Sequence, residues 1–250
     1  MIDLQLNDKV AIVTGASRGL GRAAAQALVE QGANVLAVAR SAAELENLAV
    51  QSPGYISTRV CDMRDGDAVA ALAGQAVDEF GSIDIVVNNA GIAPAGLFLE
   101  QEEQIWDEVM AVNVTAPAIL ARAAGHHMVA QGSGKIINIA STSGILGKAA
   151  LVAYSTSKGA LIQFTKALAA EWAGKGVQVN AIAPGAFETD AQRVVLDSPE
   201  ILSRRLRKIP ARRMGDTTEI GPLICYLASA KSDFVTGSVY VIDGGESCKL

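Results

Sequence analysis

The feature that most constrains the fold is a regular alternation of two kinds of segment. Seven short runs rich in β-branched and other apolar residues recur along the chain, at 9–15, 34–39, 55–62, 83–88, 135–141, 177–183 and 238–243. Their apolarity is continuous rather than alternating, as in strands covered on both faces. Ala- and Leu-rich stretches with helical spacing lie between most of them. This alternation predicts an α/β fold: a doubly wound, seven-stranded parallel sheet with helices on both faces.

Glycines at the ends of predicted helices and the absence of linkers indicate a single domain. Gly32, Gly81 and Gly176 fall where a left-handed residue would end a helix before the next strand. There is no internal repeat and no Pro- or Ser-rich linker, so residues 1–250 are predicted to form a single domain. The segment at about 186–212 breaks the alternation, and we expect it to form short helices that act as a substrate flap.

Charge and composition narrow the class of partner. Among 250 residues, 26 are acidic and 21 are basic, which gives a formal net charge of -5. Nucleic-acid binding needs a basic stripe, which this sequence lacks, so a small-molecule partner is favoured. The start has no signal-peptide pattern, and no apolar run approaches the ~20 residues that span a bilayer. The sequence therefore predicts a cytoplasmic protein that binds neither nucleic acid nor membrane.

No metal site is expected. Cys61, Cys225 and Cys248 have no spacing typical of a disulfide framework or a zinc site. His126 and His127 are adjacent, and neighbouring residues on a helix point about 100° apart, which makes a poor chelating pair. We interpret them as surface histidines near a helix end.

A glycine-rich loop follows the first predicted strand. The sequence "TGASRGLG" places Gly15, Gly19 and Gly21 between that strand and a helix. Glycines let the backbone turn tightly and approach a ligand, and the start of the helix offers unpaired N–H groups to a pyrophosphate. A tight turn without a ligand is the alternative. Its position in the first strand–helix–strand unit favours dinucleotide binding.

The end of the second predicted strand bears on the choice of dinucleotide. An acidic residue there would bind the 2′-hydroxyl of the adenosine ribose, whereas a neutral residue followed by Arg suits a 2′-phosphate. Here Ala39 is followed by Arg40, and Arg18 lies inside the glycine loop. An Arg fork matches phosphate oxygens, so NADP(H) is favoured and NAD(H) is possible. The alternative is that both arginines are simply solvated.

A phenol and an amine share one face of a predicted helix. In "AYSTSKGAL", Tyr154 and Lys158 lie four residues apart and therefore one turn apart. Together with "TGASRGLG", "NNAG" at 88–91, "VNVTAP", "NIAS" and "APG" at 183–185, this segment resembles the short-chain dehydrogenase/reductase family, of the compact type. The likeness runs from about residue 7 to 245 and implies a Rossmann fold and an NAD(P)-dependent oxidoreductase acting on a carbonyl or secondary alcohol.

The resemblance implies four catalytic residues. Tyr154 would donate a proton to the carbonyl oxygen, or remove one from the alcohol. Lys158 would favour the phenolate, since a free phenol has a pKa of ~10, and would also hold the nicotinamide ribose. Ser141 would bind the substrate oxygen. Asn113 would position Lys158 through water.

The resemblance also implies a set of cofactor-binding residues. Asp62 would meet the adenine amino group, Asn88 would line the cofactor, and Thr189 would meet the nicotinamide carboxamide, while Asn89 could instead be structural. The full predicted set is Gly15, Ser17, Arg18, Gly19, Leu20, Gly21, Arg40, Asp62, Met63, Asn89, Ala90, Gly91, Tyr154, Lys158, Pro184, Gly185 and Thr189.

The substrate is left open by the sequence. Residues expected to face it are Ala93, Pro94, Ser143, Ile145, Leu146, Ala149, Phe187 and the flap at about 186–212, Arg193 included. The first candidate is a 3-oxoacyl thioester, the alternative is a sugar acid such as gluconate, and a third interpretation is a catalytically idle NADP-binding protein. The flap carries several cations, which could meet a carboxylate or a phosphate or could form a solvated helix face: Arg193, Arg204, Arg205, Arg207 and Lys208. By resemblance, a homotetramer paired through helices at about 102–131 and 153–174 is expected.

Overall fold

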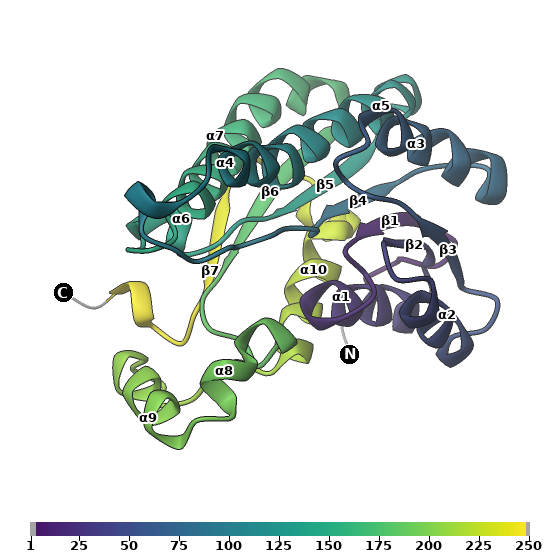
Figure 1. Cartoon of the computed structure of the whole chain (residues 1–250). Helices are drawn as coiled ribbons and strands as arrows, with labels where there is room; N and C mark the ends of the chain where they lie inside the picture. The colour runs from purple at the N-terminus through teal and green to yellow at the C-terminus, as the bar shows by residue number, and fades with distance from the viewer. Residues whose placement is uncertain (1–3, 249–250) are drawn as a thin grey trace.

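A single sheet organises the molecule. The computed structural model describes residues 4–248, and its seven strands are all parallel, in the order β3-β2-β1-β4-β5-β6-β7 (Figure 1). The strands are β1 (Val10–Thr14), β2 (Asn34–Ala39), β3 (Ile56–Val60), β4 (Ile85–Asn88), β5 (Gly134–Ile139), β6 (Val177–Pro184) and β7 (Val239–Ile242). The order reverses between β1 and β4, the position at which ligands bind in open α/β sheets.

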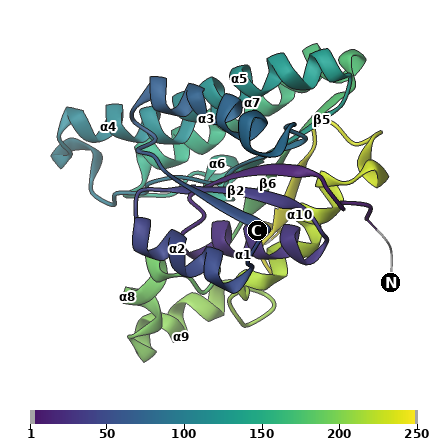
Figure 2. The ribbon, with the colours of Figure 1, turned by 90° about the vertical axis from the view of Figure 1, so that its right-hand side faces the viewer.

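Helices cover both faces of this sheet. They are α1 (Gly19–Glu30), α2 (Ala42–Gln51), α3 (Gly66–Phe80), α4 (Glu103–Met110), α5 (Ala116–Gln131), α6 (Ser143–Leu146), α7 (Val152–Trp172), α8 (Arg193–Leu196), α9 (Pro199–Lys208) and α10 (Gly221–Ala228). Viewed after a 90° turn, α3, α4, α5 and α7 lie on one side of the sheet, and α1, α2 and α10 on the other (Figure 2). The doubly wound α/β fold predicted from the sequence is confirmed.

Strand residues alternate between two cores. Ala11 and Val13 of β1 pack with α1, α2 and α10, whereas Val10 and Ile12 pack with α3 and α5. All five residues of β1 are buried, because helices cover both of its faces. The continuous apolarity of the sequence is thereby explained.

The predicted element boundaries are close to the observed ones. Each observed strand starts and ends within three residues of its predicted run. Gly32, Gly81 and Gly176 all have positive φ, at 87°, 86° and 79°, as expected of residues that end helices. Two short helices, α8 and α9, do interrupt the alternation within 186–212.

The flap is joined to the rest of the protein by a small apolar cluster. Ala186, Ile209 and Met214 are buried together and pack against partly buried leucines and a valine of α8 and α9. In the cartoon, α8 and α9 project from the sheet below the C-terminal segment (Figure 1). None of the helices in the described part of the chain is long and apolar enough to cross a membrane.

Candidate active site

A cavity of about 640 Å³ opens at the carboxyl ends of the strands, between the sheet and the flap. The predicted catalytic and cofactor residues that line it are Gly15, Ser17, Arg18, Gly19, Leu20, Arg40, Asp62, Met63, Asn89, Ala90, Gly91, Ser141, Tyr154, Lys158, Pro184, Gly185 and Thr189. Three predicted residues, Gly21, Asn88 and Asn113, lie behind its wall rather than on it. The fold thus gathers residues that are far apart in the sequence, from Gly15 to Thr189, into one site.

The glycine loop forms a close-packed turn at the start of α1. Gly15 has a φ of +65°, and a Cβ placed on Gly21 would be 2.2 Å from the Gly15 carbonyl oxygen. Gly21 therefore allows the helix to approach the loop, which is its role behind the wall. No side chain caps the first turn of α1, so its N–H groups face the cavity without a protein partner at the cap. This arrangement fits a dinucleotide pyrophosphate.

Asn89 ties the neighbouring strand to the glycine loop. Its Nδ2 donates to the carbonyl oxygens of Thr14, at 2.9 Å, and Gly15, at 3.2 Å. The Thr14 hydroxyl in turn accepts from the backbone N–H groups of Asn89 and Ala90. Asn89 lines the cavity and also fixes its wall, so the structural role foreseen as an alternative is present.

Asn88 does not take the predicted position. Its side chain is buried within the sheet, where Nδ2 donates to Oδ1 of Asn138 at 2.9 Å. Successive residues of a strand point to opposite faces, so only one of the two adjacent asparagines can turn toward the loop. The prediction that Asn88 lines the cofactor site is therefore wrong.

At the adenosine end, Asp62 already has a cationic partner. Arg64 donates to its carboxylate through Nη2, at 2.6 Å, and through its backbone N–H, at 2.9 Å. These bonds to Arg64 are the main reason that the pKa of Asp62 falls to about 2, and Arg40 adds to the effect. The sequence did not single out Arg64. Asp62 is thus a firmly ionised group on the cavity wall, close to Arg40.

Tyr154 and Ser141 form the reactive pair. Both line the cavity, and Ser141 Oγ accepts from the backbone N–H of Ser143 at 3.1 Å. Burial raises the pKa of Tyr154, and the neighbouring Ser141 side chain opposes that rise. A phenol and a serine hydroxyl side by side can both contact one substrate oxygen, which suits proton transfer to or from it.

Lys158 lies one turn along α7, in a wholly buried position. Its Nζ donates to the carbonyl oxygen of Ile139 at 2.7 Å and lies 5.8 Å from the centre of the Tyr154 ring. Burial lowers the pKa of Lys158 to about 8. The sequence predicted that this ammonium would lower the pKa of Tyr154, but the net direction is upward. Loss of water around the phenol outweighs the other influences.

Asn113 supports this pair from behind the wall. It lies in a π-helical turn, Ala111–Thr115, between α4 and α5. Its Nδ2 donates to the Ile92 carbonyl and to Ser157 Oγ, both at 2.9 Å, and its Oδ1 accepts from the Ile92 N–H. A Cβ built at Gly91 would lie 3.3 Å from Asn113 Oδ1 and 3.4 Å from Lys158 Nζ, so these two atoms face the same small space.

The substrate end differs from the sequence prediction. Ala93, Ser143 and Phe187 line the cavity as expected. Pro94, Ile145, Leu146, Ala149 and Arg193 do not. Gln192 and Arg205 line it from the flap, which was expected to face the substrate. Lys148 and Leu151 also line it, and no motif in the sequence marks either of them.

No metal centre is present in the described residues, because no three His, Cys, Asp or Glu side chains among residues 4–248 are grouped to hold an ion. His126 and His127 are exposed near the end of α5, as a surface pair would be. The cavity is lined by hydroxyl, amine and guanidinium groups together with the glycine loop.

A glycine loop at the switch point of a parallel sheet, combined with a Ser–Tyr–Lys group on the same cavity, defines an NAD(P)-dependent oxidoreductase. The family model described as "Enoyl-(Acyl carrier protein) reductase" matches residues 15–247. The chain belongs to the short-chain dehydrogenase/reductase family, as the sequence motifs predicted.

Relatives within this family have different substrates in their names. The chain is 37% identical over 246 residues to a 3-oxoacyl-(acyl-carrier-protein) reductase of Vibrio cholerae, covering 97% of this chain and 98% of that protein. It is 39% identical over 249 residues to a 2-dehydro-3-deoxy-D-gluconate 5-dehydrogenase of Pseudoalteromonas atlantica, covering 96% of each. A solved gluconate 5-dehydrogenase from Burkholderia cenocepacia, in complex with NADP and tartrate, matches with a TM-score of 0.94 and 34% identity, covering 99% of this chain and 98% of that one.

Proposed function

We propose that this protein is an NADP(H)-dependent oxidoreductase that interconverts a ketone and a secondary alcohol on a sugar acid. The observation that carries the proposal is the neighbouring pair of Tyr154 and Ser141, which shares one cavity with Lys158 and the glycine loop. A binding module without catalytic activity would need the loop but not the buried amine beside the phenol.

Tyr154, Ser141 and Lys158 each have a separate role in the reaction. Bound NADP(H) supplies or accepts the hydride. In the reductive direction, Tyr154 donates its proton to the ketone oxygen while Ser141 donates a hydrogen bond to the same oxygen. Lys158 keeps positive charge beside the phenolate that results, because its ammonium persists up to a pH of about 8. In the oxidative direction, Tyr154 accepts the alcohol proton.

The preference for NADP(H) rests on two guanidinium groups. Arg18 and Arg40 line the adenosine end of the cavity, and Ala39, which ends β2, is neutral. A ribose phosphate carries two negative charges that such groups bind through charge-assisted hydrogen bonds. The gluconate 5-dehydrogenase structure that contains NADP, with 34% identity to this chain, supports the same assignment.

The substrate class rests on the cations at the opposite end. Lys148 and Arg205 line the cavity there, which suits a substrate with a carboxylate. The second candidate is a 3-oxoacyl thioester, which the Vibrio cholerae relative and the apolar side chains of Leu151 and Phe187 support. A net charge of -5 disfavours an acidic carrier protein as the thioester's bearer.

The test is the initial rate of NADPH oxidation with 5-ketogluconate and with acetoacetyl-coenzyme A, with NADH in parallel. We expect 5-ketogluconate and NADPH to give the fastest turnover. Faster turnover of the thioester would select the second candidate. An absence of turnover with every ketone would instead indicate a catalytically idle protein.

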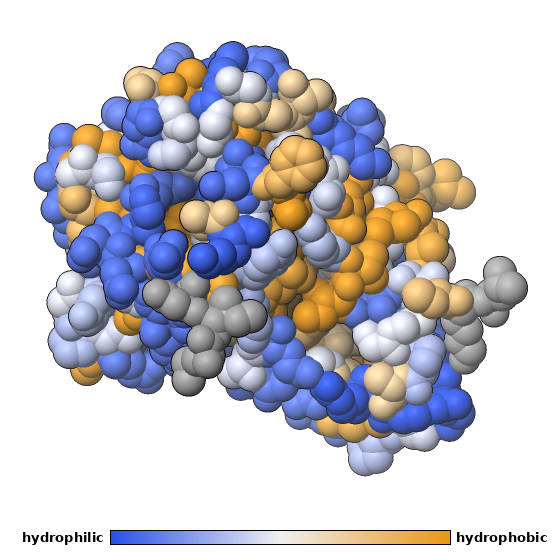
Figure 3. All heavy atoms as spheres, turned by 180° about the vertical axis from the view of Figure 1, so that it is seen from behind, coloured by the Kyte–Doolittle hydropathy of each residue, from blue (hydrophilic) through white to orange (hydrophobic). Residues whose placement is uncertain are grey.

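A homotetramer is proposed as the working assembly. The strand β7 is the edge of the sheet, and its residues are exposed or half-buried. Viewed from behind, apolar surface forms a band across the molecule (Figure 3). Such a band is typical of a surface that another subunit covers. Light scattering should give four times the mass of one chain, and the mass of a monomer would contradict the proposal.

A further inference from the structure

Lys148 is presented to the cavity by a loop with an unusual backbone. The loop connects α6 to α7, and within it both Gly147 and Ala150 have positive φ, at 67° and 61°. Two hydrogen bonds hold it: the Leu151 N–H donates to the Lys148 carbonyl at 3.2 Å, and the Gly96 N–H donates to the Ala150 carbonyl at 2.9 Å. Left-handed backbone at a residue other than glycine persists only where the surroundings enforce it, and it is concentrated at functional sites.

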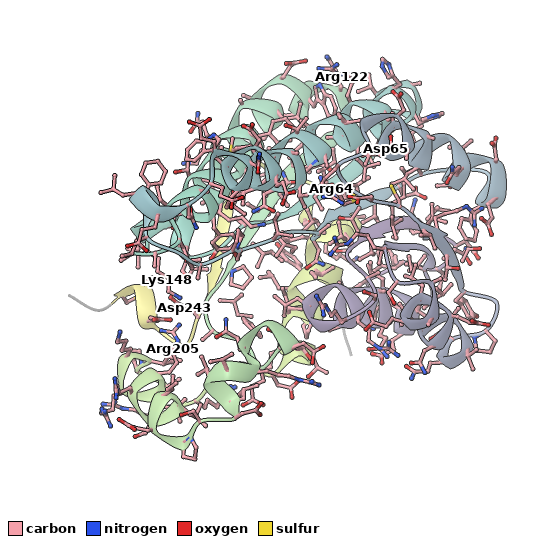
Figure 4. The ribbon with its side chains drawn as sticks, in the orientation of Figure 1. Arg64, Asp65, Arg122, Lys148, Arg205 and Asp243 are labelled. Carbon is pink, nitrogen blue, oxygen red and sulfur yellow. The ribbon has the colours of Figure 1, made fainter. Side chains whose placement is uncertain are left out.

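The carboxylates of Glu246 and Asp243, near Lys148, form ion pairs or hydrogen bonds with other groups. Arg205, on α9, forms a two-pronged ion pair with Glu246, and each of these side chains is only 20% exposed. Asp243 accepts from the backbone N–H groups of Gly245, at 2.8 Å, and Ser247, at 2.6 Å. Lys148, Asp243 and Arg205 gather on the side of the cavity nearest to α9 (Figure 4).

Lys148 therefore has an ammonium without a direct partner. Among residues 4–248, no side chain forms an ion pair or a hydrogen bond with it; Glu246 attracts it only at longer range. The side chain as a whole is exposed, but partial desolvation lowers the pKa of Lys148, and Arg205 adds to that effect. A partly desolvated cation at the wall of a binding cavity gains most from a ligand that carries negative charge.

We infer that Lys148 is a specificity-determining residue that binds the carboxylate of the substrate, while the reacting carbon of that substrate lies at Tyr154. This inference rests on the proposed function and adds to it the residue that selects an acid over a neutral polyol. Arg205 is paired with Glu246, so among the described residues Lys148 is the cation without a direct partner at this end of the cavity, and its ammonium suits a carboxylate. Lys148 and Tyr154 are six residues apart, on the loop and first turn of one segment, so the two contacts have a fixed relation.

The test compares an acid with its amide in the saturated NADP⁺ complex. Dissociation constants for gluconate and gluconamide would be measured by calorimetry in the wild type and in Lys148→Met, Lys148→Arg and Lys231→Met. Lys231 is an exposed lysine that does not line the cavity, so it is the matched control. Thermal unfolding of each variant would verify that it is folded.

We expect the wild type to bind gluconate about 10- to 100-fold more tightly than gluconamide, the range for a hydrogen bond between charged groups. Lys148→Met should abolish this preference, whereas Lys148→Arg should retain most of it and Lys231→Met all of it. A wild type without preference for the acid, or a Lys148→Met variant that keeps the preference, would overturn the inference.

This experiment separates the inference from the proposed function, because binding to the NADP⁺ complex needs no turnover. A lost acid preference in Lys148→Met together with no ketone reduction in the wild type would contradict the function and leave the carboxylate site standing. Normal reduction of 5-ketogluconate, combined with an unchanged acid preference in Lys148→Met, would overturn the carboxylate site and leave the proposed function standing.

Discussion

The two ends of the cavity are built in different ways. The cofactor end consists of the glycine loop and the carboxyl ends of β1, β2 and β4, whose side chains and backbone groups bond to one another within the sheet. The substrate end brings together the loop at 147–151, which backbone hydrogen bonds hold, with the flap and the segment at 243–248, which the half-buried Arg205–Glu246 ion pair joins. The cofactor end is therefore an extension of the core, whereas the substrate end is formed by surface segments.

The two ends of the cavity should also differ in stability and mobility. The strands of the cofactor end are covered by two large apolar cores, whereas the flap is anchored by the small cluster of Ala186, Ile209 and Met214. Segments with few buried apolar contacts open at a lower free energy than the core does. We therefore expect substitutions at the cofactor end to alter a fixed site, and those at the substrate end to alter a movable one.

The largest effect should arise where the two ends meet, at Tyr154. Tyr154→Phe removes the proton donor while it preserves the ring, so kcat for ketone reduction should fall about 10²- to 10⁴-fold. The dissociation constant of NADPH, measured by fluorescence titration, should be unchanged. Tyr55→Phe is the control, because Tyr55 is 48% exposed and outside the cavity. Retained turnover in Tyr154→Phe would contradict the assignment of the proton donor.

At the cofactor end, Arg40→Ala should weaken NADPH binding about 10- to 100-fold, since it removes a charge-assisted contact to the 2′-phosphate. NADH binding should be unaffected, because NADH lacks that phosphate. Arg122→Ala is the matched control: Arg122 is exposed on α5, on the far side of the helical layer (Figure 4). If the affinities for NADPH and NADH fell equally in Arg40→Ala, the 2′-phosphate would lie elsewhere.

At the substrate end, Arg205→Gln should raise KM for an acidic substrate about fivefold, in line with the ~1 kcal/mol of a modest ion pair. The substitution frees the carboxylate of Glu246 to repel the substrate and loosens α9. Arg204→Gln, which removes an exposed pair with Glu200 on the same helix, is the control. Steady-state kinetics would measure both. If Arg205→Gln changed the affinity for NADPH rather than KM for the acidic substrate, the two ends of the cavity would not be independent.

The last prediction concerns stability and its dependence on pH rather than kinetics. The folded-state pKa of Lys158 is about 8, below the ordinary lysine pKa of 10.5, so between these pH values the unfolded chain binds a proton that the folded protein has released. Stability of the wild type therefore rises across this window relative to Lys158→Met, which has no such group. Any stability advantage of Lys158→Met should be largest below pH 8, on the order of 3 kcal/mol or less, and should shrink toward pH 10.5. Urea unfolding at several pH values would measure it.

Lys231→Met provides the control for this comparison, since an exposed lysine should show no such difference between pH 8 and 10.5. A pH-independent difference between the wild type and Lys158→Met would mean that burial does not shift the pKa of Lys158. The difference in stability between the two proteins would then arise from packing.

The sheet and the glycine loop could be predicted because their causes are local in sequence. Continuous apolar runs can satisfy only strands that are covered on both faces, and Gly15 and Gly21 permit a backbone approach that no larger residue allows. Tyr154 and Lys158 were predicted to share a face because helical periodicity alone places them one turn apart. The side of the strand to which Asn88 turns was missed, since period-two alternation needs a register that the sequence leaves open.

The sequence by itself determined the fold, the dinucleotide loop and the spacing of the Tyr–Lys pair, each a matter of short-range pattern. Only the tertiary structure decided the net direction of the Tyr154 pKa, because desolvation depends on everything that packs around the phenol. It also decided that Arg205 pairs with Glu246, 41 residues further along the chain, and that Lys148 has no ion-pair partner among the described residues. Ion pairing among surface segments follows from how the chain folds back on itself, and no local pattern encodes it.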